Sequence, residues 1–132
     1  MQMSKRRNYS TGAKWEPIVG YSRAVRIGNV IEVSGTCAVD ENGNPFAPGD
    51  AYKQTQRIFE IIGKSLEELG SKVDDVVRTR MFVTNINDWG EIGKAHGEVF
   101  HTIRPVTTMV EVSKLISPEY VVEIEATAIL QE

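Results

Sequence analysis

Two stretches near the end of the chain decide its fold: Arg104–Val112, which reads RPVTTMVEV, and Val121–Ala128, which reads VVEIEATA. Both alternate at a period of two and are rich in β-branched side chains, a pattern typical of β-strands. On the second strand, one face is apolar and the other carries Glu123, Glu125 and Thr127. We therefore predict two paired strands, each with one face toward the core.

The same alternation assigns faces on the first strand. Thr107, Met109 and Glu111 alternate with β-branched residues, and we expect these three on the same exposed face as Glu123 and Glu125. Either water covers that face or another subunit does, and the two cases describe different proteins.

The first half of the chain predicts a hairpin and a helix. Strands over Tyr21–Ile27 and Val30–Cys37 are joined at Gly28-Asn29, a hairpin signal. Asp50 is placed as a helix N-cap, and Gly70 supplies the C-terminal stop. The helix between them carries one apolar stripe, which consists of Ile58, Phe59, Ile62, Leu66 and Leu69.

A strand over residues 76–84 and a second helix follow. Asn87-Asp88 opens this helix, and Glu91 lies three residues after Asp88, the spacing of a capping box. Its predicted buried stripe consists of Trp89, Ile92, Ala95, Val99 and Phe100. The element order is then β-β-α-β-α-β-β.

This order predicts an α+β fold in a single domain over residues 1–132, with residues 1–17 as an extended arm. Two helices cannot cover both faces of a sheet of about five strands, so one face is left for another subunit. We infer an oligomer, because exposing Met109 and its β-branched neighbours to water costs ~25 cal/mol per Å².

Composition excludes several classes of protein. The net charge of −3 gives no electrostatic reason to expect nucleic acid, and we read the short basic run Lys5-Arg6-Arg7 as a solvated tail. No apolar stretch approaches ~18 residues, so we expect no membrane span and a cytoplasmic protein. The single cysteine excludes an intramolecular disulfide, and the two histidines and one cysteine form no metal-ligand pattern.

Few residues offer catalytic chemistry, and each also has a structural interpretation. Glu123 and Glu125 are solvated strand residues unless a second subunit covers them, which would desolvate a carboxylate and suit it to acid–base catalysis. Cys37 lacks a nearby base in the sequence, which favours a buried structural thiol.

The remaining candidates favour structural roles more strongly. His96 is expected to be a packed histidine, and His101 to stabilise the end of the second helix. Arg78 and Arg80 are expected to form interface ion pairs with the glutamates. Trp15 is expected to anchor the arm by packing.

Several short motifs, taken together, resemble one known family from about Trp15 to Ala128. The motifs are Gly20-Tyr21-Ser22-Arg23-Ala24-Val25, Gly28-Asn29, Val33-Ser34-Gly35-Thr36, Asp75-Val76-Val77, Met81-Phe82-Val83-Thr84 and the two strands quoted first. On these residues the chain resembles the RidA/YjgF family. The resemblance implies a chorismate-mutase-like α+β fold and a homotrimer, with the sheets as an inner barrel and three clefts between subunits. It also implies hydrolysis of reactive enamines and imines to a carbonyl compound and ammonia, without a cofactor.

The resemblance also assigns site residues. The family's cleft tyrosine matches Tyr21, its strand Ser-Gly matches Ser34-Gly35, and its water-positioning glutamate matches Glu123. The family's substrate-binding arginine is replaced by Thr107, and Met109 follows two residues later as a further substrate-binding candidate. Gly93 stands where the family has an asparagine.

Threonine at position 107 changes the expected substrate. An arginine binds a carboxylate bidentately, whereas threonine offers one hydroxyl and no charge. We therefore expect a hydrolase of small imines or enamines other than the usual carboxylate-bearing ones. The alternative is a non-catalytic trimer that binds a small metabolite in the same cleft. A third reading, RNA cleavage, is disfavoured by the acidic charge.

Overall fold

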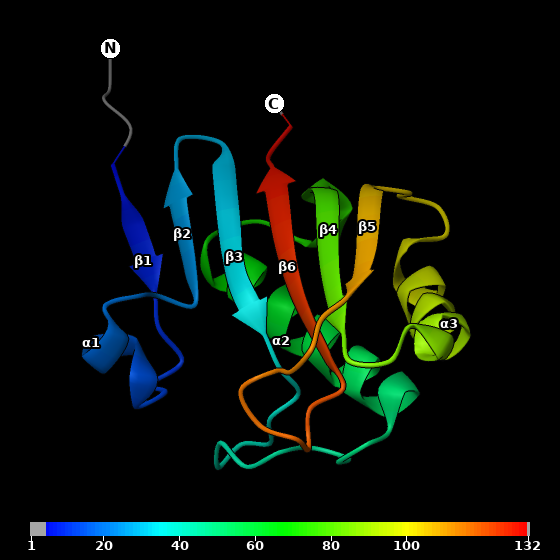
Figure 1. The fold of residues 1–132 in the computed structure, drawn as a ribbon. Coiled ribbons are helices and arrows are strands. Elements are labelled where there is room, and N and C mark those ends of the chain that lie inside the picture. Colours follow the sequence, from blue (N-terminus) through cyan, green and yellow to red (C-terminus); the bar gives the residue numbers. More distant parts are fainter. Residues whose placement is uncertain (1–4, 132) are drawn as a thin grey trace.

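The computed structural model describes residues 5–131, and over these residues it forms one six-stranded sheet in the order β1-β2-β3-β6-β4-β5 (Figure 1). All neighbouring pairs are antiparallel except β4 and β5, which run parallel. The strands are β1 (Arg7–Tyr9), β2 (Ala24–Ile27), β3 (Val30–Thr36), β4 (Val76–Val83), β5 (Val106–Glu111) and β6 (Val122–Ile129). This is the α+β architecture that the sequence predicts.

Two long helices cover one face of the sheet. α2 (Ala51–Glu68) crosses behind the strands in Figure 1, and α3 (Trp89–Phe100) lies beside it near β5. A short helix, α1 (Trp15–Val19), stands apart beside β1 and β2. Two 3-10 turns, η1 (Val73–Asp75) and η2 (Ile86–Asp88), flank β4. The opposite face of the sheet is left open.

No helix within the described residues is long and apolar enough to cross a membrane.

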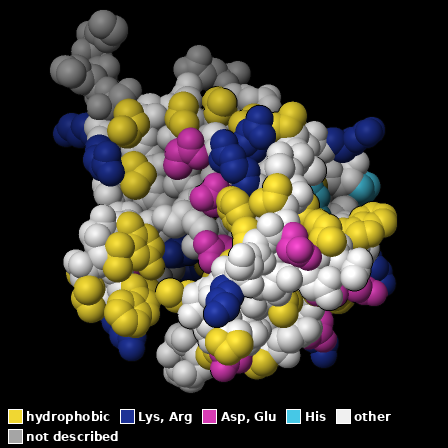
Figure 2. All heavy atoms as spheres, in the orientation of Figure 1, with side chains coloured by type: hydrophobic (Ala, Val, Ile, Leu, Met, Phe, Trp, Pro, Cys, Tyr) yellow, Lys and Arg dark blue, Asp and Glu magenta, His cyan; other side chains and the backbone are white. Residues whose placement is uncertain are grey.

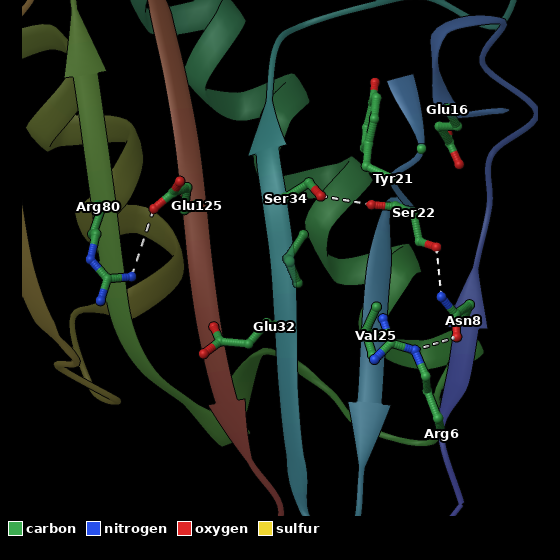
Figure 3. Close-up of a pocket in the computed structure, with 12 residues that line it drawn as sticks. Arg6, Asn8, Glu16, Tyr21, Ser22, Val25, Glu32, Ser34, Arg80 and Glu125 are labelled. Atoms are coloured by element: carbon green, nitrogen blue, oxygen red, sulfur yellow. Dashed lines mark hydrogen bonds and ion pairs between the residues drawn. The ribbon is translucent and has the colours of Figure 1, made fainter. Parts of the chain in front are cut away.

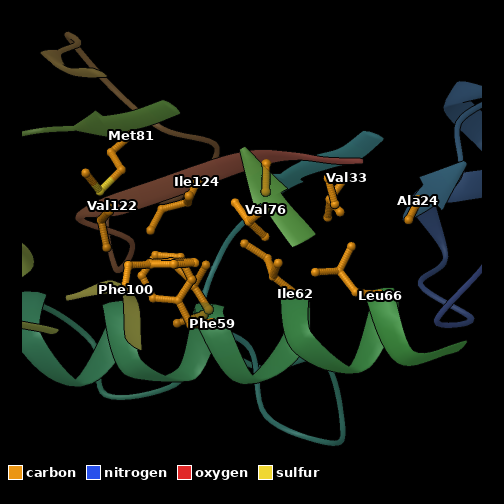
Figure 4. Packing of buried hydrophobic residues seen from close by; sticks show 14 of the residues in the cluster. Ala24, Val33, Phe59, Ile62, Leu66, Val76, Met81, Phe100, Val122 and Ile124 are labelled. Carbon is orange, nitrogen blue, oxygen red and sulfur yellow. The ribbon is translucent and has the colours of Figure 1, made fainter. Parts of the chain in front are cut away.

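The core lies between α2 and the sheet, as the sequence predicts (Figure 4). The Asp50 carboxylate accepts a hydrogen bond from the Lys53 backbone N–H and caps the start of α2. At its end Gly70 adopts φ 82°, and the Ser71 N–H reaches back to the Leu66 carbonyl. The predicted stripe is buried throughout: Ile58, Phe59, Ile62, Leu66 and Leu69.

The pairing of the last two strands differs from the prediction. β6 lies between β3 and β4, and β5 pairs with β4 on the outer edge of the sheet. The chain reaches β5 through α3, and such a helical crossover is what places two strands in parallel. Alternation identifies a strand and its faces but not its partner, so the predicted pairing of these two strands is wrong.

The predicted face of Thr107 and Met109 is also wrong. In the register of the sheet Thr107 lies opposite the buried Thr79, and Met109 lies opposite the buried Met81. Both therefore belong to the helix-covered face, whereas Glu123 belongs to the open face. The valines of β5 gave the opposite signal: Val106 and Val110 lie on the open face and are 56% and 42% exposed.

Residues 5–17 form more structure than the extended arm that was predicted for residues 1–17. Arg7–Tyr9 pairs with β2 as an edge strand, and Trp15–Val19 is helical, while residues 1–4 lie outside the described part. Proline at position 17 is tolerated because it falls in the first turn of that helix. Trp15 remains 52% exposed, so it does not pack as the anchor that was expected.

The start of α3 also differs from its prediction. Asp88 makes no side-chain capping bond, so the capping box with Glu91 does not form. The Asn85 side chain instead accepts from the Asn87 N–H one turn earlier. Trp89 is 65% exposed, although the other residues of the predicted stripe are buried or half-buried.

Candidate functional site

The open face of the sheet carries a cleft of about 610 Å³. It extends from the α1 end, where Glu16 and Tyr21 lie, across β3 to Arg80 and Glu125 on β4 and β6 (Figure 3). We call this the open-face cleft. In the space-filling view hydrophobic side chains gather over α1, and acidic and basic side chains lie across the neighbouring strands (Figure 2).

Two of the predicted site residues, Tyr21 and Ser34, line this cleft. The Ser34 hydroxyl donates to the Ser22 carbonyl at 2.6 Å, and the Asn8 amide donates to the Ser22 hydroxyl at 2.8 Å. The Ser34 hydroxyl proton is therefore used in a hydrogen bond to the backbone, and the Ser34 oxygen has lone pairs that can accept a hydrogen bond from a ligand. The Tyr21 ring is 36% exposed.

Glu123 lies beside Gly35 on the same open face. A Cβ atom built on Gly35 would stand 3.1 Å from the Glu123 Cδ, so the glycine makes room for the carboxylate. The register of β3 against β6 shifts between Val33 and Thr36, a bulge-like irregularity at this point. Such irregularities re-aim side chains, and they recur next to functional sites.

The Cys37 thiol donates a hydrogen bond to the Glu123 Oε1, with an Sγ–O distance of 3.2 Å. Burial raises the pKa of this thiol well above its usual range, and the adjacent Glu123 carboxylate raises it further. Cys37 is thus a protonated thiol, in agreement with its expected structural character. Its contact with Glu123 was not predicted.

Arg23 holds this part of the strand in place. Its guanidinium Nη1 donates to the Gly35 carbonyl at 2.9 Å and to the Thr36 Oγ1 at 3.0 Å, and the guanidinium carbon Cζ lies 5.7 Å from the centre of the Tyr21 ring. Only 9% of Arg23 is exposed. Sequence reasoning quoted this arginine within a motif but gave it no role; its only signal was a charge inside a β-patterned run.

Glu16, in α1, is a second residue that sequence reasoning missed. It is 3% exposed, and its Oε2 accepts from the Thr11 hydroxyl at 2.8 Å and from the Thr11 N–H. Burial alone would raise the pKa of this carboxyl. Hydrogen bonds from Ser10 and Thr11, with the charge of Arg23, outweigh burial and lower the pKa. Glu16 is therefore a buried carboxylate that ties the preceding loop to α1.

The two glutamates of β6 have different surroundings. Glu125 forms an ion pair with Arg80 of the same chain at 3.7 Å, whereas the expectation for the strand arginines was pairing across an interface, and both side chains are more than a third exposed. Such a pair contributes little to stability. Glu123 is instead held by the thiol of Cys37 beside a glycine. Only Glu123 has surroundings that fix the direction of its carboxylate.

Thr107 belongs to a chain of hydrogen bonds on the other side of the sheet. Its Oγ1 lies 2.6 Å from the Thr79 Oγ1, which in turn lies 2.9 Å from the His96 Nε2. His96 packs between Phe59 and Phe100, and burial lowers its pKa. This is the packed histidine that was expected. Within one chain the sheet separates Thr107 from Glu123.

Met109, Gly93 and His101 do not line the open-face cleft. Met109 packs against the core. At Gly93 an added Cβ would meet no atom within 4 Å. His101 lies at the end of α3, with its Nδ1 3.2 Å from the Gly97 carbonyl. Among residues 5–131, no three His, Cys, Asp or Glu side chains gather closely enough to hold a metal ion.

Comparison with known proteins gives a consistent set of relatives. Residues 11–130 match the family model described as endoribonuclease L-PSP. The chain is 32% identical to a 2-iminobutanoate/2-iminopropanoate deaminase from Dermatophagoides farinae, over 98% of this chain and all of that protein. It is 31% identical to the 3-aminoacrylate deaminase RutC of Acinetobacter baylyi, over 85% of this chain and 88% of that one.

Solved structures agree with the fold. The crystal structure of Rv2704 from Mycobacterium tuberculosis, described as a member of the YjgF/YER057c/UK114 family, superimposes with a TM-score of 0.87. It is 44% identical and covers 96% of this chain and 100% of its own. A protein of unknown function from Pseudomonas aeruginosa, PA3499, gives 0.83 at 31% identity, over 97% of this chain and 94% of its own.

Proposed function

The chain belongs to the endoribonuclease L-PSP family, whose members also carry the names YjgF and RutC, and from this premise we propose that it hydrolyses small reactive imines or enamines to a carbonyl compound and ammonia. Relatives that are named as deaminases of such compounds support this reaction class. The observation that carries the proposal is the Glu123 carboxylate, directed by Cys37 and accommodated by Gly35.

The proposed chemistry requires one general base that also returns a proton. Glu123 accepts a proton from water as the water oxygen bonds to the imine carbon, which gives a carbinolamine. The proton then passes to nitrogen and completes the neutral carbinolamine. Glu123 next takes the carbinolamine hydroxyl proton and delivers it to the nitrogen, the C–N bond breaks with its electron pair on nitrogen, and ammonia leaves as the carbonyl forms. A positioned carboxylate contributes ~10²–10⁴-fold to such a reaction. Tyr21 and Ser34 would bound the substrate from the open-face cleft; Gly35 and Glu123 do not line this cleft, so the substrate would extend past Ser34 to reach the Glu123 carboxylate.

We propose a homotrimer with the ligand between subunits. Thr107 and Met109 lie on the other face of the sheet from Glu123, so these residues can touch one ligand only across a subunit boundary. Exposed apolar side chains support an assembly, since Ile18 and Val19 of α1 are 69% and 70% exposed. The edge strand β5 also presents its unpaired side to a neighbour.

The side chain at position 107 determines which kind of substrate group we expect the site to bind. Its hydroxyl is bonded to Thr79 and carries no charge, so it offers hydrogen bonding to a neutral group rather than a clamp for a carboxylate. This favours imines or enamines without a carboxylate at that point. The same observation favours our second candidate, a non-catalytic trimer that binds a small neutral metabolite.

Ammonia release from imines generated in situ tests the proposal. Wild-type protein should accelerate release, with neutral precursors favoured over carboxylated ones, and Glu123→Gln should lower the rate by ~10²–10⁴-fold without dissociating the trimer. Glu125→Gln is the comparison, because Glu125 lies two residues away on the same strand face but pairs with Arg80 and has no contact with Cys37; its loss should be at most about 10-fold. Equal small effects at both positions would remove the catalytic role of Glu123, and saturable binding without turnover would favour the second candidate.

A further inference from the structure

The thiol of Cys37 and the carboxylate of Glu123 meet across 86 residues of sequence. Cys37 follows the last residue of β3, just after the irregular pairing with β6, and Arg23 fixes that irregular stretch through the Gly35 carbonyl and the Thr36 hydroxyl. These hydrogen bonds from Arg23 restrain the backbone that precedes Cys37 and so fix the position of the thiol beside Glu123.

The direction of this hydrogen bond is determined by charge. An ionised carboxylate has no proton to donate, so the S–H must donate to the Glu123 Oε1. A thiolate in the same place would add a second negative charge in a half-buried site. The contact exists only while the sulfur keeps its proton.

The two carboxylate oxygens of Glu123 consequently differ. Oε1 accepts from the thiol, and Oε2 is the atom nearest to the space where a side chain on residue 35 would begin. The nearby arginines bond elsewhere, Arg23 to the backbone of β3 and Arg80 to Glu125. The thiol holds Oε1, whereas no hydrogen bond to Oε2 is found among residues 5–131.

We propose that Cys37 is a positioning residue for Glu123: its thiol holds Oε1 so that Oε2 faces the water that attacks the substrate. This inference rests on the proposed hydrolytic function of Glu123. It adds a residue whose effect passes through Glu123, without contact with the substrate.

Four variants of the chain test the role: Cys37→Ala, Cys37→Ser, Glu123→Gln and the double variant Cys37→Ala/Glu123→Gln. Cys37→Ala removes the donor and should lower kcat by about 10-fold while KM changes by less than about twofold. Cys37→Ser retains a donor of similar size and should recover most of the lost kcat. In the Glu123→Gln background, Cys37→Ala should have no further effect on kcat, because the two residues act through one group.

The outcomes separate this inference from the proposed function. Full turnover by Glu123→Gln would overturn the proposed function and this inference with it. A large loss in Glu123→Gln with unchanged kcat in Cys37→Ala would overturn the positioning role alone. Equal losses in the Ala and Ser variants, or an additive loss in the double variant, would also overturn it, because they indicate a packing defect. Thermal unfolding of each variant verifies that the protein is folded during the assay.

Discussion

Adding a single methyl group at Gly35 should displace the proposed catalytic carboxylate without unfolding the protein. In Gly35→Ala the new Cβ would lie 3.1 Å from the Glu123 Cδ, and one carboxylate oxygen would stand closer still. The backbone itself accepts alanine, since Gly35 is not among the glycines with positive φ. The conflict is therefore with the end of one side chain, which can rotate away.

The magnitudes follow from what that rotation breaks. Glu123 would lose its bond to the Cys37 thiol, about 0.5–1.5 kcal/mol, and would leave its preferred rotamer at a similar cost. We expect Gly35→Ala to lower the free energy of unfolding by about 1–3 kcal/mol. Turnover should fall by about 10²-fold or more, since a displacement of about 1 Å is enough to disrupt a positioned catalytic group.

Denaturant unfolding and ammonia release, measured on the same samples, give both quantities. Gly97→Ala is the matched control, because the same methyl group would meet no atom within 4 Å there and alanine is the better helix former by about 0.5–1 kcal/mol. It should keep wild-type turnover and gain stability. Wild-type turnover in a folded Gly35→Ala would refute the reasoning, since it would mean that catalysis does not depend on where this carboxylate stands.

Three further predictions concern single side chains. Burial and the Glu123 carboxylate raise the pKa of Cys37 in the folded protein. Above pH 9, where the thiol of the unfolded chain ionises first, the free energy of unfolding should therefore fall by up to ~1.4 kcal/mol per pH unit. Urea unfolding at pH 8 and 10 should show this loss in the wild type and much less of it in Cys37→Ser. Burial lowers the pKa of His96, so the unfolded chain takes up the proton first, and the free energy of unfolding should fall as the pH drops below about 6.5. In His96→Phe the free energies of unfolding at pH 7 and pH 5 should differ less than in the wild type. An unchanged difference would count against His96 as the cause. Thr107→Arg should raise kcat/KM for carboxylate-bearing imines by about 10–100-fold in the assembled protein, and a folded trimer with no gain would show that the site differs in more than this residue.

Local patterns predicted the elements whose signals lie within one segment. The apolar stripe that includes Ile58 and Ile62 fixed α2 and its buried face, and the alternation from Val122 to Ala128 fixed the buried face of β6. The family resemblance, rather than periodicity, pointed to Glu123.

What the sequence did not predict depends on distant contacts. The partner of β5 and the face of Thr107 are set by the α3 crossover and by register, and the valine-rich face of β5, which the alternation predicted as buried, is the exposed one. The bond between Cys37 and Glu123 joins residues too far apart for any spacing rule. The exposure of Trp89 shows that an apolar residue at helical spacing is not thereby buried.

The sheet places Thr107 and Glu123 on opposite sides of a packed layer, so that the proposed roles of these two residues, ligand selection and hydrolysis, are carried by separate parts of the chain. A substitution at Thr107 perturbs Thr79 and His96 under the helices and leaves the thiol that holds Glu123 untouched. Within one chain the two side chains share no hydrogen-bond partner, and stability changes at such sites add to within about 0.3–0.5 kcal/mol. If the proposed roles hold, a substitution at Thr107 changes which ligands bind while the hydrogen bond from Cys37 to Glu123 is retained.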